Sequence, residues 1–366
     1  MIKIIHILFS SNIGGGEKIT FEIINRLKNK FNFKIIAPLG VFFEKYLQLG
    51  IESQLLKRGN IFRIINKIRN FIKKVNPEIV HCQGTRAALW TKLAIIGLKK
   101  RPKMIYTLHG FHIIRRSFFS KWPLVFLERF LNYLTDVLVC TSESDKNLVL
   151  KYKTISPEKI KIIKNGIEIK KNQKDPREIE KIKKEMQLEN NFVISSIARL
   201  RPPKDFSTIL RALKLIICQI PNSRLLIVGD GPLRKSLEKE TEKLRLSPYV
   251  KFLSFRKDIA TLINLSDLVI LSTKWEGLPL VPLEVGIAKK PIIASNVDGM
   301  REVVLDKKTG YLFIPGFEKD LADKILKLYF SKDLREKMGE EAYYFVLENF
   351  NNERMLKEYQ NLYQSL

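Results

Sequence analysis

Short, nearly continuous apolar runs rich in β-branched residues alternate with helical patterns from one end of the chain to the other. Strands that are buried on both faces have this composition, and helices between them make the strands parallel, with right-handed crossovers. The sequence therefore predicts an α/β fold built from repeated strand–helix–strand units. The predicted strands are 2–9, 33–39, 51–56, 78–83, 104–109, 136–141, 159–163, 192–198, 224–228, 250–255, 267–272, 291–295 and 310–314.

The alternation restarts after a polar stretch, Lys170–Pro176, which we interpret as an interdomain linker. A chain of 366 residues also exceeds what one hydrophobic core usually holds. We therefore expect one domain over residues 1–168 and a second over 177–345. The tail from Ser331 is helical in pattern to the end, and we expect residues 346–366 to form a helix that returns to the first domain.

The charge is unevenly distributed along the chain. The formal net charge is +27, and residues 1–166 hold 30 Lys and Arg against 10 Asp and Glu. Such an excess favours anionic partners: nucleic acid, an anionic membrane face or phosphorylated small molecules. A genome rich in Lys and Ile would raise the total but explains the asymmetry less well.

Cysteine usage and hydropathy indicate the compartment. Cys82, Cys140 and Cys218 lie far apart in apolar runs, so we expect buried free thiols, with neither a disulfide nor a metal site. The apolar run 4–9 is too short for a signal peptide, and no apolar run is long enough to span a bilayer. We expect a protein that is cytoplasmic or bound to the cytoplasmic membrane face.

Glycines and a histidine follow predicted strands of the first half, where open α/β sheets bind ligands. Gly14, Gly15 and Gly16 precede Glu17 and an amphipathic helix, so backbone N–H groups there suit a phosphate or a sugar hydroxyl. An ordinary tight turn explains the glycines equally well. His109 ends a strand and is followed by Gly110, which suits a place in a cleft or a structural role. His112 lies one turn further along the chain.

Cations and carboxylates follow strands of the second half. Arg199 ends a strand and should be semi-buried, and Lys204 precedes a helix, so the two match a diphosphate. Glu276 follows another strand, and Glu284 lies among apolar residues of the next helix, where a carboxylate needs donors such as sugar hydroxyls. Both carboxylates arise beside one nucleotide-like loop, which disfavours glycoside hydrolysis.

In this order, the motifs resemble the family-4 glycosyltransferases of the GT-B class, of the type that builds capsular and other envelope polysaccharides. The resemblance covers residues 2 to about 314. The residues that carry it are Gly14–Glu17, His109-Gly110, Asn165-Gly166-Ile167, Ala198-Arg199-Leu200 with Lys204, Gly229-Asp230-Gly231-Pro232, the pair Glu276 and Glu284, and Val303-Val304 with Thr309-Gly310. It implies two Rossmann-like domains with parallel sheets facing across a cleft, and a final helix that crosses back.

The resemblance also implies roles for individual residues. His109 and Glu276 would act in catalysis, and Gly14, Glu17 and His112 would lie on the acceptor side. The donor nucleotide sugar would be held by Gly15, Gly16, Arg199, Lys204, Gly229, Gly231, Glu276, Gly277, Leu278 and Glu284. Departures such as Asp205 and Arg301, where the family often has Gly and Pro, make the identity of the donor less secure.

Family membership implies a hexosyltransferase that retains anomeric configuration. Because the sequence has no Asp-x-Asp motif, two fixed cations would replace a metal at the departing diphosphate, and no cofactor is expected. The partners would be a nucleotide sugar and a glycan or lipid-linked acceptor of the cell envelope. A nucleotide-sugar epimerase of related plan remains an alternative, as does a basic nucleic-acid-binding protein, although no nucleic-acid-binding motif is present and we expect no such partner.

Two basic, aromatic segments could contact an anionic membrane. Residues 61–75 repeat apolar side chains at helical spacing, and residues 111–134 interleave Arg and Lys with Phe and Trp. For 61–75, an ordinary helix that packs on the core explains the pattern equally well.

Overall fold

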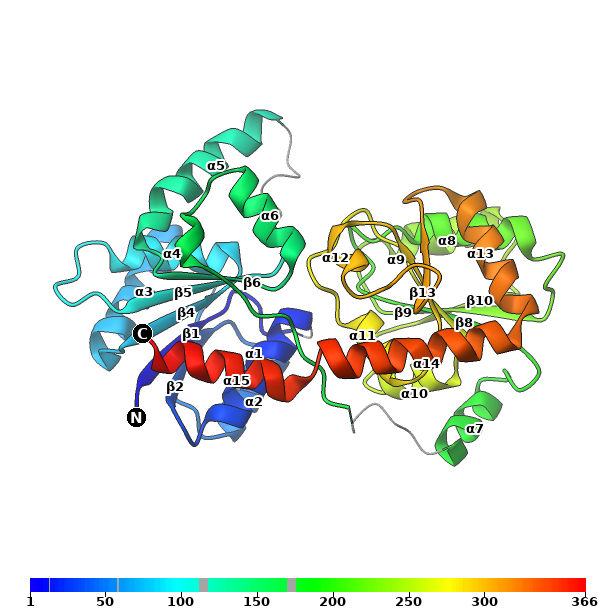
Figure 1. The fold of residues 1–366 in the computed structure, drawn as a ribbon, viewed down its shortest axis with the longest axis horizontal. Helices are drawn as coiled ribbons and strands as arrows, with labels where there is room; N and C mark the ends of the chain where they lie inside the picture. The colour runs from blue at the N-terminus through cyan, green and yellow to red at the C-terminus, as the bar shows by residue number, and fades with distance from the viewer. Residues whose placement is uncertain (13, 58, 112–117, 170–175) are drawn as a thin grey trace. The chain divides into compact units, whose positions relative to one another are not determined.

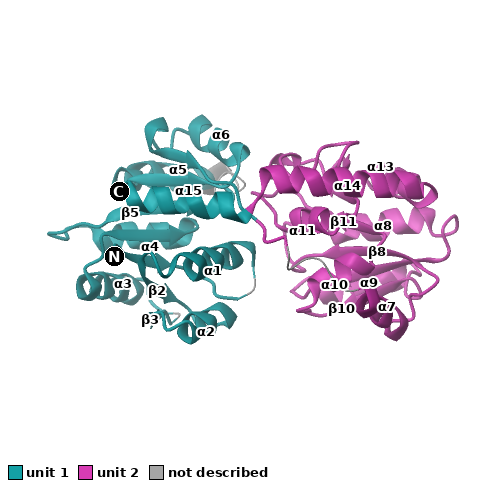
Figure 2. Ribbon diagram, turned by 60° about the horizontal axis from the view of Figure 1, so that its bottom comes forward, with its two compact units in different colours: residues 1–166, 352–366 teal, residues 167–351 magenta. Residues whose placement is uncertain are grey.

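The computed structural model describes residues 1–366 except 13, 58, 112–117 and 170–175. The chain forms two compact units (Figures 1 and 2). Unit 1 comprises Met1–Gly166 together with Asn352–Leu366, and unit 2 comprises Ile167–Asn351. Each unit is an α/β domain, so the expected fold class is confirmed.

Unit 1 holds a seven-stranded parallel sheet in the order β3-β2-β1-β4-β5-β6-β7. Its strands are β1 (Lys3–Ile7), β2 (Asn32–Ala37), β3 (Ser53–Leu55), β4 (Ile79–Gln83), β5 (Lys103–Leu108), β6 (Val137–Cys140) and β7 (Ile160–Ile162). Its helices are α1 (Gly15–Leu27), α2 (Val41–Gln48), α3 (Ile61–Val75), α4 (Thr85–Ile95), α5 (Phe118–Leu131), α6 (Glu143–Lys151) and α15 (Asn352–Gln364).

Unit 2 holds a six-stranded parallel sheet in the order β10-β9-β8-β11-β12-β13. Its strands are β8 (Phe192–Ile197), β9 (Ser223–Val228), β10 (Val250–Leu253), β11 (Leu268–Leu271), β12 (Ile292–Ser295) and β13 (Gly310–Phe313). Its helices are α7 (Pro176–Glu185), α8 (Phe206–Ile216), α9 (Arg234–Lys243), α10 (Ile259–Leu265), α11 (Val281–Ile287), α12 (Asp298–Arg301), α13 (Glu318–Phe330) and α14 (Lys332–Asn349).

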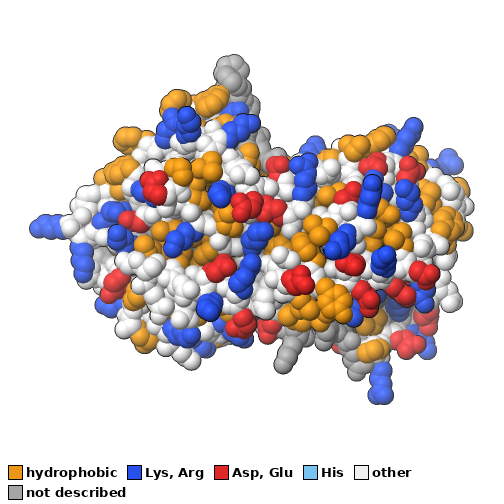
Figure 3. All heavy atoms as spheres, viewed as in Figure 1, with side chains coloured by type: hydrophobic (Ala, Val, Ile, Leu, Met, Phe, Trp, Pro, Cys, Tyr) orange, Lys and Arg blue, Asp and Glu red, His pale blue; other side chains and the backbone are white. Residues whose placement is uncertain are grey.

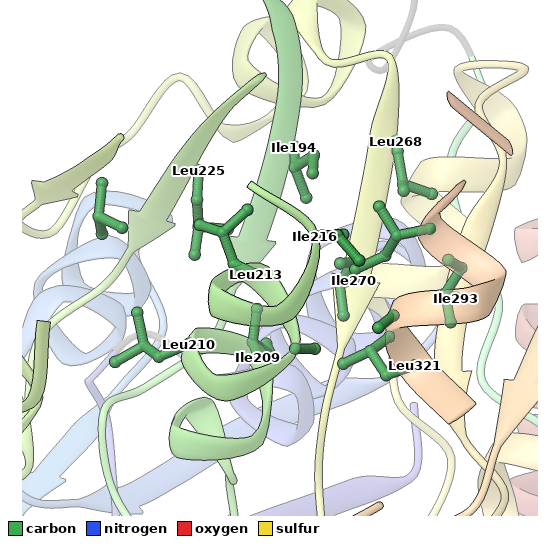
Figure 4. Packing of buried hydrophobic residues seen from close by; sticks show 14 of the residues in the cluster. Ile194, Ile209, Leu210, Leu213, Ile216, Leu225, Leu268, Ile270, Ile293 and Leu321 are labelled. Carbon is green, nitrogen blue, oxygen red and sulfur yellow. The ribbon is translucent and has the colours of Figure 1, made fainter. Parts of the chain in front are cut away.

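The predicted strands all form, within a few residues of the expected bounds. The central ones are buried on both faces: every residue of β6, β8, β11 and β12 is buried. Side chains of α8 cover one face of the unit 2 sheet, and Figure 4 shows Ile209, Leu213 and Ile216 beside strand residues such as Leu225 and Ile270. The apolar runs therefore encode the sheets, because their residues have no polar face to present to water.

Both units have the strand order of a Rossmann fold, in which the order reverses beside the first strand of the unit. The reversal falls between β1 and β4 in unit 1, and between β8 and β11 in unit 2. Loops that leave these two neighbouring strands diverge to opposite faces, which opens a crevice at the carboxyl edge of the sheet. The fold therefore predicts that ligands bind at the loops after β1, β4, β8 and β11. The cleft expected between the two sheets stays a prediction.

The C-terminal boundary differs from the expected one. Residues 346–351 belong to unit 2, because α14 continues to Asn349 and buries Val346 and Phe350 in the core of that unit. The helix that packs in unit 1 is α15, and its Met355 sulfur accepts a hydrogen bond from the backbone N–H of Gly166 at 3.1 Å. Of the expected linker, residues 170–175 lie outside the described part of the chain.

Cys82 and Cys140 are buried as expected, but Cys218 is exposed, because it follows the last turn of α8 instead of lying within that helix. The helix 61–75 forms as α3, and its side chains Ile68, Phe71 and Ile72 are buried in the unit 1 core, which favours the core-packing interpretation. Within the described residues, no helix is long and apolar enough to cross a membrane.

Candidate active site

Lys204 and Glu276 form an ion pair at the switch point of unit 2. Lys204 lies in the loop after β8, and Glu276 lies in the loop after β11. The Lys204 Nζ donates to Glu276 Oε1, and both side chains are largely buried, with 16% and 17% of their areas exposed. Two of the predicted donor ligands therefore meet where the fold opens its crevice.

Backbone contacts between the same two loops fix the position of this ion pair. The N–H of Asp205 donates to the Ser272 carbonyl at 3.1 Å, and the N–H of Lys274 donates to the Pro203 carbonyl at 3.0 Å. Lys204 and Thr273 also form an isolated antiparallel bridge. The pair is thus held by main-chain hydrogen bonds on both sides, so its side chains need little ordering before a ligand binds.

Arg199 is exposed, so the expectation of a semi-buried side chain is wrong. Arg199 lies in the loop beyond the end of β8, whereas its neighbour Leu200 is completely buried. Arg199 makes no ion pair with any residue in the described part of the chain. Its guanidinium is therefore available to a ligand on the same loop that carries Lys204.

Gly229 and Gly231 allow the loop after β9 to pack against the loop that carries Arg199. Their φ angles are +136° and +155°, a conformation that other residues rarely adopt. A Cβ on Gly229 would lie 2.0 Å from the Ala198 carbonyl oxygen, and one on Gly231 would lie 2.4 Å from that of Leu200. These glycines thus support the Arg199–Lys204 loop, and a direct contact with the donor stays a prediction.

The loop that carries Glu276 is anchored at the two residues that follow Glu276. Leu278 is buried in the core of unit 2, and Gly277 lies beneath α12. A Cβ on Gly299 would fall 1.2 Å from the Gly277 carbonyl oxygen. Gly299 is a site residue that sequence analysis missed, although the Asp-Gly dipeptide that contains it is a turn signal that could have marked it.

Glu284 lies in the first turn of α11 and is half-buried. Helix α11 packs closely on α14 at Gly286, where a Cβ would come within 2.8 Å of Val346 Cγ2. A carboxylate in the first turn of a helix is stabilised by the N-terminal end of the helix dipole. Glu284 therefore places a carboxyl group on a rigid element, which suits hydrogen bonds from hydroxyl groups.

In unit 1, the glycine loop after β1 meets His109, which follows β5, beside the other switch point. Gly14 is the N-cap of α1, Gly15 and Gly16 begin the helix, and Glu17 is half-buried in its first turn. A Cβ on Gly16 would lie 3.1 Å from both Cδ2 and Nε2 of His109. The glycines were expected to let the backbone approach a ligand closely. At Gly16, the structure instead shows the backbone close to the imidazole ring of His109.

Gln83 is a second residue that sequence analysis missed. It ends β4, and its Oε1 lies 2.9 Å from Nε2 of His109. Its neighbour His81 is buried within the strand, as expected. His112, expected on the acceptor side, lies outside the described residues. Over the ranges that the structure describes, no three His, Cys, Asp or Glu side chains gather as metal ligands would.

Comparison with known proteins gives a consistent assignment. The model of the family "Glycosyl transferases group 1" matches residues 178–345, and that of "Glycosyltransferase Family 4" matches residues 13–171. The chain is 27% identical over 388 residues to an Escherichia coli UDP-Gal:alpha-D-GlcNAc-diphosphoundecaprenol alpha-1,3-galactosyltransferase, covering 99% of this chain and 96% of that protein. It is 26% identical over 298 residues to the capsular polysaccharide glycosyltransferase CapM of Staphylococcus aureus, covering 80% and 78%.

Solved structures share the fold. The Anabaena protein HepE, crystallised with UDP and glucose, matches with a TM-score of 0.89 at 21% identity over the full length of both chains. WaaG, a glycosyltransferase of lipopolysaccharide biosynthesis, matches with a TM-score of 0.77 at 16% identity, covering 98% of this chain and 99% of that one. The two parallel Rossmann-like sheets are thus those of a GT-B enzyme. The chain belongs to the family-4 glycosyltransferases.

Proposed function

We propose that this glycosyltransferase is a retaining, metal-independent hexosyltransferase that moves a hexose from a UDP-sugar to a lipid-linked envelope glycan. The observation that carries the proposal is the Lys204–Glu276 pair at the unit 2 switch point, beside the exposed Arg199. Arg199 and Lys204 would bind the diphosphate, while Glu276 would accept from the transferred sugar and Glu284 from the ribose. The two cations match the negative charge of the diphosphate, and the two carboxylates match the hydroxyl groups of the sugar and the ribose, which donate hydrogen bonds.

The chemistry follows from those contacts. The bond between the anomeric carbon and the diphosphate oxygen breaks, and an acceptor hydroxyl attacks from the same face. Its proton passes to the departing phosphate, so that configuration is retained and no enzyme nucleophile is needed. Fixed positive charge stabilises the departing diphosphate most in the transition state, which is where stabilisation accelerates the reaction. His109, at the end of β5, would contact the sugar.

The donor and acceptor classes come from the relatives. The Escherichia coli relative is named for UDP-Gal and a diphosphoundecaprenol-linked sugar, and HepE was crystallised with UDP-glucose. A UDP-hexose and a polyprenyl-diphosphate glycan are therefore the first substrates to test.

A donor screen tests the nucleotide-binding part of this proposal. UDP-hexoses should raise the melting temperature of the wild-type protein, and Lys204→Ala should abolish the increase while the protein still folds. Lys257→Ala is the matched control, because Lys257 is an exposed lysine after β10, at the edge of the same sheet. Loss of the shift in both variants, or in neither, would contradict the assigned role of Lys204. Consumption of the donor without an acceptor would instead indicate an epimerase.

We also propose that α5 binds an anionic membrane surface, where a lipid-linked acceptor would lie. The polar side of α5 faces inward: Lys92 of α4 is completely buried, with its Nζ 3.4 Å from Glu128 Oε1 and 2.6 Å from Asn132 Oδ1. Asn132 in turn donates to the Thr154 carbonyl at 2.9 Å. Burial of a charged pair is costly unless its partners are satisfied, so this cluster fixes which side of α5 faces the core.

The opposite side of α5 is aromatic and faces outward. Phe126 is 62% exposed and Phe130 is 72% exposed, and Tyr133 follows them on the surface. The same helix carries two cations: Lys121 lies over the Trp122 ring, and Arg129 donates to the Lys153 carbonyl at 2.8 Å. Figure 3 shows hydrophobic side chains interleaved with Lys and Arg over this part of unit 1. Exposed aromatic residues flanked by cations are typical of surfaces that lie in a membrane interface.

Liposome binding tests the membrane proposal. Phe126→Asp/Phe130→Asp should abolish sedimentation with vesicles that contain anionic lipid, and should leave binding of UDP unchanged. Phe330→Asp is the matched control, since Phe330 is an aromatic residue of unit 2 with 69% of its area exposed. The absence of wild-type binding at moderate salt would overturn the proposal.

A further inference from the structure

A buried hydrogen-bond network lies behind His109 in unit 1. Its members come from three neighbouring strands and from the last helix: His6 of β1, His81 and Gln83 of β4, Thr107 of β5 and Tyr363 of α15. All are buried except Gln83, which is half-buried and points toward His109. Polar groups in a core are costly unless satisfied, so such a network specifies one arrangement of its side chains.

The Gln83 amide contacts three imidazole rings. Its Nε2 lies 3.3 Å from His6 Nδ1 and 3.2 Å from His81 Nε2, whereas its Oε1 lies 2.9 Å from His109 Nε2. An amide nitrogen only donates and an amide oxygen only accepts. The facing nitrogens of His6 and His81 are therefore acceptors, and Nε2 of His109 carries a hydrogen. The neutral His109 ring then has its acceptor nitrogen at Nδ1.

Tyr363 satisfies the other side of the two buried histidines. With acceptor nitrogens facing Gln83, the neutral rings carry their hydrogens on His81 Nδ1 and His6 Nε2. These atoms lie 2.8 Å and 3.2 Å from the Tyr363 hydroxyl oxygen, which can accept two hydrogen bonds. Burial lowers the pKa of His6 to about 3, and burial together with the neighbouring histidines lowers that of His81. Both rings therefore remain neutral at neutral pH.

The contacts of Tyr363 favour this orientation of the amide over the flipped one. A flipped Gln83 would present its amide nitrogen to His109 and would require hydrogens on the facing nitrogens of both buried rings. Those rings would then both need a donor at Tyr363, which has one hydroxyl hydrogen. Gly16 also packs against the Nε2 edge of His109, because a Cβ on Gly16 would lie 3.1 Å from Nε2, so the ring has little free space beside its contact with Gln83.

We propose that Gln83 is a positioning residue that holds His109 in the tautomer with hydrogen on Nε2, and that Tyr363 fixes the orientation of Gln83. The last helix of the chain then controls the hydrogen-bonding state of an active-site residue. The catalytic consequence rests on the proposed function, but the tautomer itself does not.

Nitrogen-15 NMR of the histidine-labelled full-length protein tests the tautomer directly, with His109 assigned from a His109→Gln variant. The wild type should show His109 protonated at Nε2. Gln83→Met, which keeps the length of the side chain and removes the amide, should give a mixture of tautomers. Tyr363→Phe, which removes only the hydroxyl, should shift His109 in the same direction and serves as the second variant if Gln83→Met does not fold.

Tyr359→Phe is the matched control. Tyr359 lies on the same buried side of α15, and among the described residues its hydroxyl contacts only Thr107, at 3.5 Å. Its substitution should leave the His109 tautomer unchanged. An unchanged His109 spectrum in both Gln83→Met and Tyr363→Phe would overturn the proposal.

Transfer kinetics provide the second readout. In Gln83→Met, kcat should fall by about 10- to 100-fold while the KM for the donor changes little, because orientation of the reacting groups is lost and donor binding is not. A rise in KM without a fall in kcat would contradict a positioning role. A protein that shows the expected tautomers but transfers no sugar would refute the proposed function and leave the role of Gln83 intact.

Discussion

Gly299→Ala should weaken nucleotide binding without placing any new atom in contact with the nucleotide. The Cβ would lie 1.2 Å from the Gly277 carbonyl oxygen, whereas ordinary contacts begin at 3.4 Å. The carbonyl and the methyl group must therefore separate by about 2 Å, and overpacking of this kind costs about 1–3 kcal/mol. Because Glu276 directly precedes Gly277, the displacement should disturb its ion pair with Lys204.

Calorimetry of UDP binding measures the consequence, and we expect the dissociation constant to rise by about tenfold or more, since about 1.4 kcal/mol corresponds to a factor of ten. Gly316→Ala is the matched control in the same unit. Gly316 has a φ of +79° and no atom near its Cβ position, so alanine there introduces backbone strain alone. Equal affinity for UDP in Gly299→Ala and wild type would refute the argument, as would an equal loss in Gly316→Ala.

Three further predictions concern the donor site and the core. Arg199→Ala should abolish the thermal shift by UDP, whereas Glu276→Ala should mainly reduce transfer, which parallel binding and turnover assays would distinguish. Glu128→Gln should destabilise unit 1 by about 3–5 kcal/mol in urea unfolding, because it leaves the buried Lys92 without a charged partner; a loss within error of zero would contradict this. Burial lowers the pKa of His6 to about 3, so between about pH 6.5 and pH 3 the unfolded state binds a proton that the folded state does not. The free energy of unfolding should therefore fall as the pH drops through this range, by about 1.4 kcal/mol per pH unit for that group. The decrease between pH 7 and pH 5 should be smaller in His6→Asn than in the wild type.

The strands and the order of the motifs could be predicted from the sequence because both are local. A buried parallel strand needs a continuous apolar run, and each predicted run formed one. Residue placement that depends on two distant segments could not be predicted. Gly299 matters because α12 lies on Gly277, and Gln83 matters because Tyr363 of the last helix completes its network.

Two errors have the same origin. Val346 and Phe350 continue a helical pattern, but the pattern does not say which core buries them, and they pack in unit 2. Arg199 follows an apolar strand, which suggested burial, but it lies in the loop beyond the end of β8, where its side chain is exposed. On α5 likewise, the sequence did not reveal that Lys92 of α4 holds Glu128 in the core while Phe126 and Phe130 lie on the surface.

The most direct test of the account is NMR analysis of the product formed from an α-linked UDP-hexose and a polyprenyl-diphosphate acceptor in the presence of EDTA. We predict a new α-glycosidic bond, formed at the same rate with and without the chelator, and none in a Lys204→Ala/Arg199→Ala variant. A β-linked product, a requirement for added metal, or full activity in that variant would contradict the claim that fixed cations of the second unit activate the departing diphosphate.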